Sequence, residues 1–148
     1  DTDSALLFQE WLIPVCAPAL AAQAIADLTR CELIHPSVDR RDWRRWLQKT
    51  ALWPELSLSG GKVFETLEQG NMAAISGHGV SVGDLLLSLD AVRDGLLALP
   101  FSQAVATGDG YWLVWPKQAV EQGALRQLLD FMLQNVPGGI PQGIALLE

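Results

Sequence analysis

The residues whose types and spacing best fit ligand binding lie at the start of a predicted helix. Thr66 stands three residues before Gln69, which is the spacing of a capping box, and Gly77 falls where a helix would end in a left-handed backbone conformation. A capped helix start directs free backbone N–H groups toward whatever lies in front of it. Four residues at this edge are therefore candidates for contacting a ligand: Phe64, Glu65, Thr66 and Leu67.

A second pair of candidates follows a short apolar segment. Residues 31–35 have the pattern of a strand that Pro36 stops, and His35 and Ser37 stand at its carboxyl end. Ligands bind outside the carboxyl ends of strands in open α/β sheets, so both residues are candidates for ligand contact. For His35 we favour the alternative of a structural or solvated histidine.

The sequence offers no pattern for catalysis or metal binding. Residues 60–62 are Gly-Gly-Lys, but they lack the leading glycine of a phosphate-binding loop and the Ser or Thr that follows its lysine. His35 and His78 do not have the spacing of metal ligands, and no Gly-x-Ser-x-Gly nucleophile elbow is present. We therefore expect no enzyme activity, no cofactor and no bound metal.

Length, composition and charge narrow the class of protein. A chain of 148 residues fits one domain or two small lobes, and 49% hydrophobic with 18% charged residues is typical of a folded globular chain. The net charge of −7 argues against this chain binding a nucleic-acid backbone by itself. No apolar run approaches the roughly 20 residues of a transmembrane helix, and the first residues lack a signal-peptide pattern. We expect a cytoplasmic protein that does not contact a membrane.

Predicted strands and helices alternate around the candidate residues. Pro18 opens a short Ala-rich helix, and Asp42 is placed to cap a helix that presents Trp43, Trp46 and Leu47 to a core. A further helix is predicted over residues 88–93. Strand patterns cover residues 5–8, 11–16, 31–35, 56–63, 80–82, 96–101 and 111–115. The alternation predicts an α/β fold with a mixed, mostly parallel sheet.

Proline and glycine positions add three expectations about these elements. Pro14 removes a backbone donor, so residues 11–16 form an edge strand or a segment that crosses between two lobes. Gly108 and Gly110 flank a predicted turn before residues 111–115, which give the strongest β signal in the chain. The cleanest amphipathic helix covers residues 121–136, with one apolar face made of Leu125, Leu128, Leu129, Met132 and Val136.

Four arginines form a cluster that has two interpretations. Arg40, Arg41, Arg44 and Arg45 would suit an anionic ligand or DNA. Acidic residues at positions 39 and 42 are interleaved with them, and mixed charges of this kind are typical of a solvated helix face. We therefore favour the solvated face.

Five segments, in the right order, resemble the regulatory part of LysR-type transcriptional regulators, in the branch of the glycine-cleavage and β-lactamase activators. Residues 12–21, 25–28 and 33–35 resemble the crossover into the second lobe of that family. Residues 42–47 (Asp-Trp-Arg-Arg-Trp-Leu) are similar to its "DW..WL" helix. The family's "G.GVAL", "G.LV.PF" and "YYLVYP" segments correspond to residues 77–83, 95–101 and 111–116. The resemblance covers almost the whole chain.

The resemblance implies a periplasmic-binding-protein-like (type 2) fold with one complete Rossmann-like lobe and one incomplete lobe. Residues 1–14 would be a remnant of the first lobe and the crossover, residues 15–111 the second lobe, and residues 112–148 the return strand and C-terminal helix of the first lobe. An incomplete lobe leaves an apolar helix face uncovered, so we expect self-association as a homodimer, or as a tetramer in the full-length protein. DNA binding would come only through the missing N-terminal helix-turn-helix.

In this family a small-molecule effector sits between the lobes, which implies contacts from residues 64–67 and from Tyr111. The alternatives are a plain helix cap for Thr66, core packing for Phe64 and a hydroxyl at a lobe boundary for Tyr111. The implied function is effector sensing that controls DNA-dependent transcription. The alternative is a stand-alone small-molecule-binding or interaction domain that has only the fold in common with these regulators.

One branch of the family senses redox state, which raises that possibility for the two cysteines. Cys16 and Cys31 lie in apolar strand patterns with no neighbouring lysine, although Arg30 adjoins Cys31. Such thiols are usually buried and unreactive. We expect buried, inert thiols.

Overall fold

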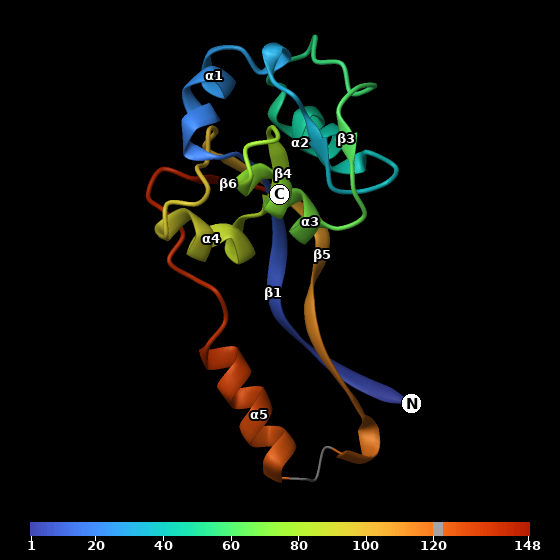
Figure 1. The fold of residues 1–148 in the computed structure, drawn as a ribbon. Coiled ribbons are helices and arrows are strands. Elements are labelled where there is room, and N and C mark those ends of the chain that lie inside the picture. Colours follow the sequence, from blue (N-terminus) through green and yellow to red (C-terminus); the bar gives the residue numbers. More distant parts are fainter. Residues whose placement is uncertain (120–122) are drawn as a thin grey trace.

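The computed structural model describes residues 1–119 and 123–148, and it shows a globular part from which a long two-stranded ribbon projects (Figure 1). The regular elements are β1 (Thr2–Val15), α1 (Ala21–Ala26), β2 (Ile34–His35), α2 (Arg41–Thr50), β3 (Lys62–Val63), α3 (Leu67–Ile75), β4 (Ser81–Asp84), α4 (Leu85–Arg93), β5 (Gln103–Pro116), α5 (Gly123–Gln134) and β6 (Ala145–Leu147). Short 3₁₀ helices cover Pro18–Leu20, Leu28–Arg30 and Lys117–Ala119. Among the described residues, none of these helices has the length and apolar character needed to cross a bilayer.

The ribbon consists of β1 and β5, two antiparallel strands of 14 residues each. Their register runs from Thr2 opposite Pro116 to Leu12 opposite Val105. The predicted turn at Gly108 and Gly110 is wrong, because β5 continues through both. Between two register pairs, the single β1 residue Glu10 faces β5 residues 107–109, and Gly108 takes a φ of +86° in this bulge. At these residues the structure therefore has a bulge within β5 in place of the predicted turn.

The four-stranded sheet is mixed, with the order β4-β1-β5-β6, and the predicted α/β class is confirmed. The pairings of β1 with β4 and with β5 are antiparallel, whereas β6 pairs with β5 in parallel and β2 pairs with β3 in parallel. Antiparallel pairing therefore predominates in the four-stranded sheet, in place of the mostly parallel pairing that was predicted. Pro14 pairs with Val82 beyond Leu12, the last β1 residue that pairs with β5. Pro14 therefore lies where β1 pairs with β4 on one side and no longer with β5 on the other, as the edge-strand alternative predicts.

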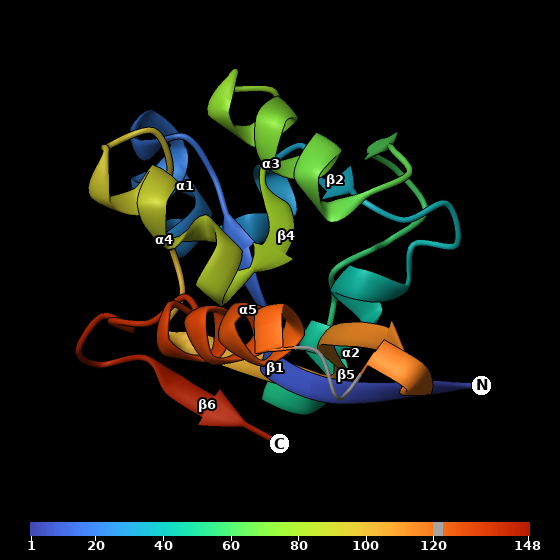
Figure 2. The same cartoon turned by 90° about the horizontal axis from the view of Figure 1, so that it is seen from below.

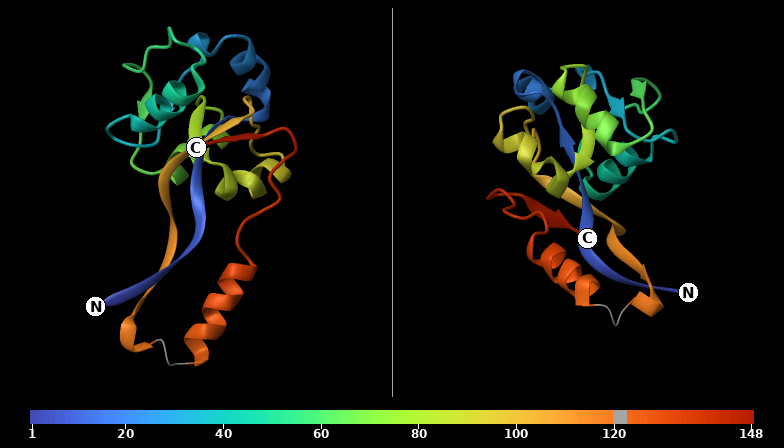
Figure 3. Two further views of the ribbon diagram at one scale, coloured as in Figure 1. Left: turned by 180° about the vertical axis from the view of Figure 1, so that it is seen from behind. Right: turned by 60° about the horizontal axis from the view of Figure 1, so that its bottom comes forward.

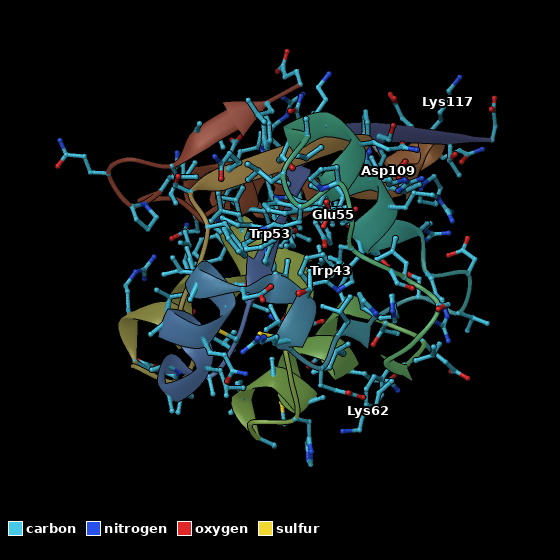
Figure 4. The ribbon with its side chains drawn as sticks, turned by 90° about the horizontal axis from the view of Figure 1, so that it is seen from above. Trp43, Trp53, Glu55, Lys62, Asp109 and Lys117 are labelled. Carbon is cyan, nitrogen blue, oxygen red and sulfur yellow. The ribbon has the colours of Figure 1, made fainter. Side chains whose placement is uncertain are left out.

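Alternate residues of β1 enter two cores on opposite faces of the sheet. Ile13 packs with α3 and α4, while Leu12 packs with α1 and α2. Figure 2 shows α3 and α4 beside β4, on one side of the projecting part of the β1–β5 ribbon. The predicted stripe of α2 is confirmed: Trp43 and Trp46 are fully buried, and their indole N–H groups donate to the carbonyls of Ile34 (2.9 Å) and Gln103 (2.8 Å). Figure 4 shows Trp43 in the interior.

The start of α2 differs from the prediction that Asp42 caps it. The helix begins at Arg41, and Asp42 is buried inside its first turn. The preceding residue, Arg40, has a φ of +60°, and the carboxylate of Asp39 accepts the Arg41 N–H at 3.2 Å. Asp39 therefore caps the helix from further upstream. Arg41 pairs with Asp39 at 3.6 Å and Arg44 is exposed, which agrees with a solvated face. Arg40 differs, because its guanidinium donates to the carbonyls of Leu58 (2.7 Å) and Gly60 (2.9 Å).

Three other predicted boundaries change. Residues 96–101, all within the described chain, form no strand, and their backbone pairing is limited to a bridge between Cys16 and Ala98. The strand predicted over residues 56–63 is reduced to Lys62–Val63. Residues 85–93 form the single helix α4, because the carboxylate of Asp84 accepts the Leu86 N–H at 3.1 Å and starts the helix before the apolar run.

The C-terminal helix α5 stands apart from the globular part at the far end of the ribbon (Figure 3). It covers Gly123–Gln134, and none of these twelve residues is buried. The helix predicted over residues 121–136 is confirmed in this range, while residues 121 and 122 lie outside the described residues. After α5 the chain returns, and β6 pairs with Gln103–Val105. The last strand therefore packs on the sheet of the globular part.

Helix α3 has the start and stop predicted for it. The Thr66 hydroxyl accepts the Gln69 N–H at 3.1 Å, and Gly77 has a φ of +82°. In the middle of the helix, Gly70 is buried against the chain. A Cβ at Gly70 would lie 2.6 Å from the Ser81 hydroxyl and 3.0 Å from Cβ of Pro36. This glycine lets α3 approach β4 closely, and β4 leads directly to Asp84.

We predict that Gly70→Ala destabilises the protein although alanine favours a helix by about 1 kcal/mol over glycine. Overpacking at this contact should lower the free energy of unfolding by about 1–3 kcal/mol, measured by urea denaturation with far-UV circular dichroism. Gly60→Ala is the matched control, because an ideal Cβ at Gly60 meets no described atom within 4 Å. A Gly70→Ala protein as stable as the control would contradict this account of the packing.

Candidate functional site

Three elements of the fold meet at Asp84, the last residue of β4. This residue pairs with Leu12 of β1 and begins α4, and only 2% of it is exposed. One carboxylate oxygen, Oδ1, accepts the Leu86 N–H. The other oxygen, Oδ2, is buried and has no partner at hydrogen-bond distance within residues 1–119 and 123–148. The Tyr111 hydroxyl and the Trp11 N–H nevertheless lie close enough to the Asp84 carboxyl to oppose the rise in its pKa that burial causes.

A pocket of about 310 Å³ opens at this carboxylate. The residues that line it come from α3, β4 and α4: Leu67, Glu68, Asn71, Asp84 and Leu87. Asn71 donates its Nδ2–H to the Ser88 hydroxyl at 3.0 Å, which orients its amide. Its Oδ1 is buried and, in the described chain, also lacks a partner. Two of the residues that line the pocket thus each hold a buried oxygen that has no partner at hydrogen-bond distance within the described chain.

Glycine at position 83 makes the position of Asn71 possible. A Cβ built on Gly83 would lie 2.5 Å from Asn71 Oδ1 and 3.0 Å from the Ser88 hydroxyl. Any larger residue would displace this amide. Asn71 and Asp84 are therefore held by the close approach of α3 and α4 to β4.

Tyr111 extends the site onto the ribbon. Its ring stacks on Phe8 with a centroid separation of 4.6 Å, and its hydroxyl donates to a carboxylate oxygen of Glu10 at 3.5 Å. Burial, followed by the nearby carboxylates of Asp84 and Glu10, raises the pKa of Tyr111 above its ordinary value. Tyr111 therefore stays a protonated hydroxyl that donates to carboxylates.

The carboxyl of Asp84 is hard to ionise. Burial raises the pKa of Asp84 from 3.8 to about 6, hydrogen bonding from Tyr111 and Leu86 opposes the rise, and the Glu10 charge adds to it. None of the five residues that line the pocket is basic. The site is a buried acidic position that lacks a cationic partner in its lining.

A more open groove of about 690 Å³ runs along the outer face of α3. Among its lining residues are Phe64, Thr66, Gln69 and Met72, and Glu68 lines both this groove and the pocket. Met72 is 59% exposed, so the groove has an apolar floor. The groove and the pocket lie on adjacent sides of the first turns of α3.

The structure brings most of the predicted site residues to this region. Phe64 and Thr66 line the groove, Leu67 lines the pocket, and Tyr111 reaches it through Asp84. The N–H of Glu65, however, donates to the Gln69 side chain at 2.9 Å. With Thr66 accepting the Gln69 N–H, the helix start uses part of its own donor set for capping.

His35 and Ser37 line neither the pocket nor the groove. His35 is fully buried, and its Nε2–H donates to the Gly60 carbonyl at 2.9 Å. Burial lowers the pKa of His35 below its ordinary value, although the bond to Gly60 opposes this. The carbonyl of Ser37 accepts the Arg40 N–H at 3.0 Å in a turn.

Sequence reasoning missed three polar residues of the site: Glu10, Asn71 and Asp84. Asp84 had a recognisable signal, because it ends a strand pattern and precedes an apolar helix, where an N-cap residue is favoured. Asn71 and Glu10 had none of their own. Their positions follow from the approach of α3 to β4 and from the β5 bulge.

The cysteines are free thiols in the described chain. Cys16 is buried, and burial, followed by the neighbouring Cys31, raises the pKa of its thiol to about 11. Cys31 is only half-buried, so the prediction of a buried thiol is confirmed for Cys16 and is wrong for Cys31. Desolvation, followed by the charge of Asp27, still raises the pKa of Cys31. Both thiols thus stay protonated at neutral pH, as expected for unreactive cysteines. The described residues hold no group of three or more His, Cys, Asp or Glu side chains suited to a metal.

We predict that the unfolding free energy of the parent protein, measured relative to that of Asp84→Asn, is larger in acid than at neutral pH. Because the pKa of Asp84 is about 6 when folded and 3.8 ordinarily, the folded state holds the proton more tightly. This stabilisation is present below pH 4 and is lost as the pH rises through 6. The difference in unfolding free energy between the two proteins should fall by on the order of 2 kcal/mol between pH 4 and 7. Urea denaturation across this range measures it, and a pH-independent difference would refute it.

The sequence matches a known family over most of its length. The profile of the LysR substrate binding domain covers residues 1–137. The chain is 26% identical over 132 residues to the glycine cleavage system transcriptional activator of Escherichia coli (strain K12). The match covers 86% of this chain and 43% of that protein, so the chain spans less than half the length of this curated relative.

Solved structures agree with this match. The effector domain of the transcriptional regulator AmpR of Pseudomonas aeruginosa is 27% identical, with a TM-score of 0.74 over 90% of this chain and 64% of that chain. The AmpR effector binding domain from Citrobacter freundii is 24% identical, with a TM-score of 0.75 over 90% of this chain and 66% of that chain, and it has the same fold. This chain belongs to the LysR substrate binding domain family.

Proposed function

We propose that this chain is the effector-sensing regulatory domain of a bacterial LysR-type transcriptional regulator. The observation that carries the proposal is the position of the pocket at Asp84. The pocket lies where α3 and β4 of the globular part meet the β1–β5 ribbon. A small molecule bound there would contact α3, β4 and α4, and Asp84 in the lining lies beside Tyr111 of the ribbon. The similar proteins are transcriptional regulators, which supports a sensing role over a catalytic one.

We propose that residues 15–111 form the second lobe and that residues 1–14 and 112–148 belong to the first. The projecting end of the ribbon supports this division, because Trp112 is 55% exposed and Val114 is 58% exposed. On α5, Phe131 is 62% exposed. Apolar side chains exposed to this extent are typical of surfaces that pack against further protein. Strand β6 is shared, since it packs on the second-lobe sheet.

The proposed contacts with the effector come from residues 64–67 and from Tyr111. Phe64, Thr66 and Leu67 line the two adjacent cavities, and Tyr111 lies beside Asp84. Glu65 adds a carboxylate at the helix edge, while its N–H is taken by Gln69. His35 has a structural role in this proposal, since its ring ties β2 to the loop at Gly60.

Effector binding would act by changing how the two lobes are oriented. A ligand shifts such an equilibrium only if it binds one orientation more tightly than the other. Because Asp84 lies in the proposed second lobe and Glu10, which the Tyr111 hydroxyl contacts, lies in the proposed first lobe, a ligand that contacts both carboxylates would have this property. We propose that self-association of the regulatory domains transmits the change to a helix-turn-helix elsewhere in the regulator, and that the regulator works in the cytoplasm.

We predict that Tyr111→Phe weakens effector binding by about 3- to 10-fold, because it removes one hydrogen-bond donor and keeps the stack on Phe8. A thermal-shift screen of amino acids, small carboxylates and muropeptides on the complete regulator identifies the compound, and isothermal titration gives its Kd for each protein. Glu55→Gln, on an exposed loop far from the pocket lining, is the control and should bind normally. An unchanged Kd in Tyr111→Phe would remove Tyr111 from the site.

A further inference from the structure

We propose that the surface around Trp53 binds an acidic segment of a partner protein that also carries apolar side chains. The surface consists of two pockets, and neither has a lining residue in common with the pocket at Asp84 or with the groove along α3. The proposal therefore goes beyond the proposed function, because it gives the domain a second interaction at a separate place. Three observations carry it: the joined pockets, the fixed position of Trp53 and the charge of α2.

The two pockets meet at Leu52 and Trp53, which line both of them. One pocket has a volume of about 420 Å³ and extends from these residues to Leu99 and Ile144. The other has a volume of about 310 Å³ and extends along α2 to Leu47. Two neighbouring apolar pockets suit a polypeptide segment, which places one side chain in each, better than a small molecule that fills only one.

The side chain of Trp53 is held by a row of aromatic rings. Trp53 meets Phe101 edge to face, with 6.4 Å between the ring centroids, and Phe101 packs on Trp46 at 5.4 Å. Trp46 is fully buried, and its indole N–H donates to a backbone carbonyl of β5. Trp53 is half-buried at the outer end of this row. A ring held in this way loses little conformational entropy when a partner binds, and tryptophan is among the residues that dominate interface energetics.

The backbone around Trp53 has an unusual conformation. Ala51 has a φ of +55° and Trp53 a φ of +51°, so both lie in the left-handed region that residues with a side chain rarely adopt. Such conformations persist only where the surrounding structure enforces them, and they cluster at functional sites. The bend that they form directs Leu52 and Trp53 toward the same surface.

The charge of α2 selects an acidic partner. Arg44 lines the pocket beside α2, is exposed, and forms no ion pair with residues 1–119 and 123–148. None of the described residues that line the two pockets is acidic. Although the net charge of the chain is −7, α2 contains four of its ten Lys and Arg residues: Arg41, Arg44, Arg45 and Lys49. Carboxylates of a partner would therefore be attracted to α2 and repelled by the more acidic remainder of the chain.

Acidic residues near α2 do not cancel this attraction. Asp39 pairs with Arg41 at 3.6 Å, and Asp42 is only 4% exposed. Glu55, on the loop after Trp53, is exposed and lines neither pocket. Within the described lining, Arg44 is thus the charged group that a partner carboxylate would meet.

The test uses a synthetic acidic peptide with leucines at helical spacing, Glu-Asp-Leu-Glu-Glu-Leu-Leu-Asp-Glu-Leu-Glu. One counterpart has lysine at every acidic position, and a second has serine at every leucine position. Each peptide is titrated into the ¹⁵N-labelled 148-residue chain at pH 7.0, and NMR follows the Leu52 amide and the Trp53 indole N–H. We expect saturable shifts of both signals with the acidic peptide, and at least tenfold weaker binding of each counterpart at these signals.

Two substitutions with matched controls locate the contact. Trp53→Ala and Arg44→Glu should each weaken binding of the acidic peptide at least tenfold. Trp112→Ala removes a tryptophan that is 55% exposed on β5, and Arg126→Glu reverses an exposed charge on α5, so both controls should bind as the parent does. If Trp53→Ala does not give a folded spectrum, the comparison of Arg44→Glu with Arg126→Glu decides.

Several outcomes would overturn this proposal. Absence of saturable shifts at Leu52 and Trp53, equal binding of the lysine counterpart, or an unchanged affinity in Arg44→Glu would each do so. A dimer in sedimentation velocity that Trp53→Ala abolishes and Trp112→Ala does not would assign the surface to a second copy of the chain instead. Tighter binding of octanoate than of the acidic peptide at these signals would assign it to a small amphiphile. All of these results leave the effector-sensing proposal standing.

Discussion

The rest of this structure depends on the antiparallel pairing of β1 with β5. The two strands start in separate parts of the sequence, and their register over residues 2–12 and 105–116 fixes how the ribbon leaves the globular part. Beyond Leu12, β1 passes to β4, so one strand connects the ribbon to the residue that starts α4. A shift of register by one residue would exchange the two faces of β1, so the β1 side chains that now fill each core would point to the opposite face of the sheet. The site therefore depends on this pairing.

The bulge in β5 sets the chemistry of the boundary. It places one β1 residue, Glu10, opposite three β5 residues and brings Tyr111 within 3.5 Å of the Glu10 carboxylate. The same tyrosine lowers the pKa of Asp84 against the larger effect of burial, which raises it. Two carboxylates thus lie close to one hydroxyl donor. Such an arrangement is destabilising without a cation, because like charges in a buried site disfavour ionisation.

The sequence predicts local structure here better than it predicts the site. Helix α3, its cap at Thr66 and its end at Gly77 follow from side chains that act on their own backbone. The buried faces of Trp43 and Trp46 follow from helical spacing. Residues 96–101 do not form the predicted strand, because apolar composition alone does not supply a neighbouring strand to pair with. Asp42 is not the cap, because the carboxylate of Asp39 accepts the N–H of Arg41, the first residue of the helix. Glu10, Asn71 and Asp84 meet only through tertiary packing.

The buried acidic site and the close packing of α3 share one cause. Gly70 and Gly83 remove side chains at the two places where helices approach β4, so the helices come near enough to exclude water from Asp84. Without water, the carboxylate keeps an acceptor that the described chain does not satisfy and has a pKa of about 6. Desolvating this carboxylate costs free energy, and a ligand with complementary hydrogen-bond donors would recover part of that cost on binding. A tightly packed globular part is therefore compatible with a responsive site, because the packing itself buries the carboxylate of Asp84.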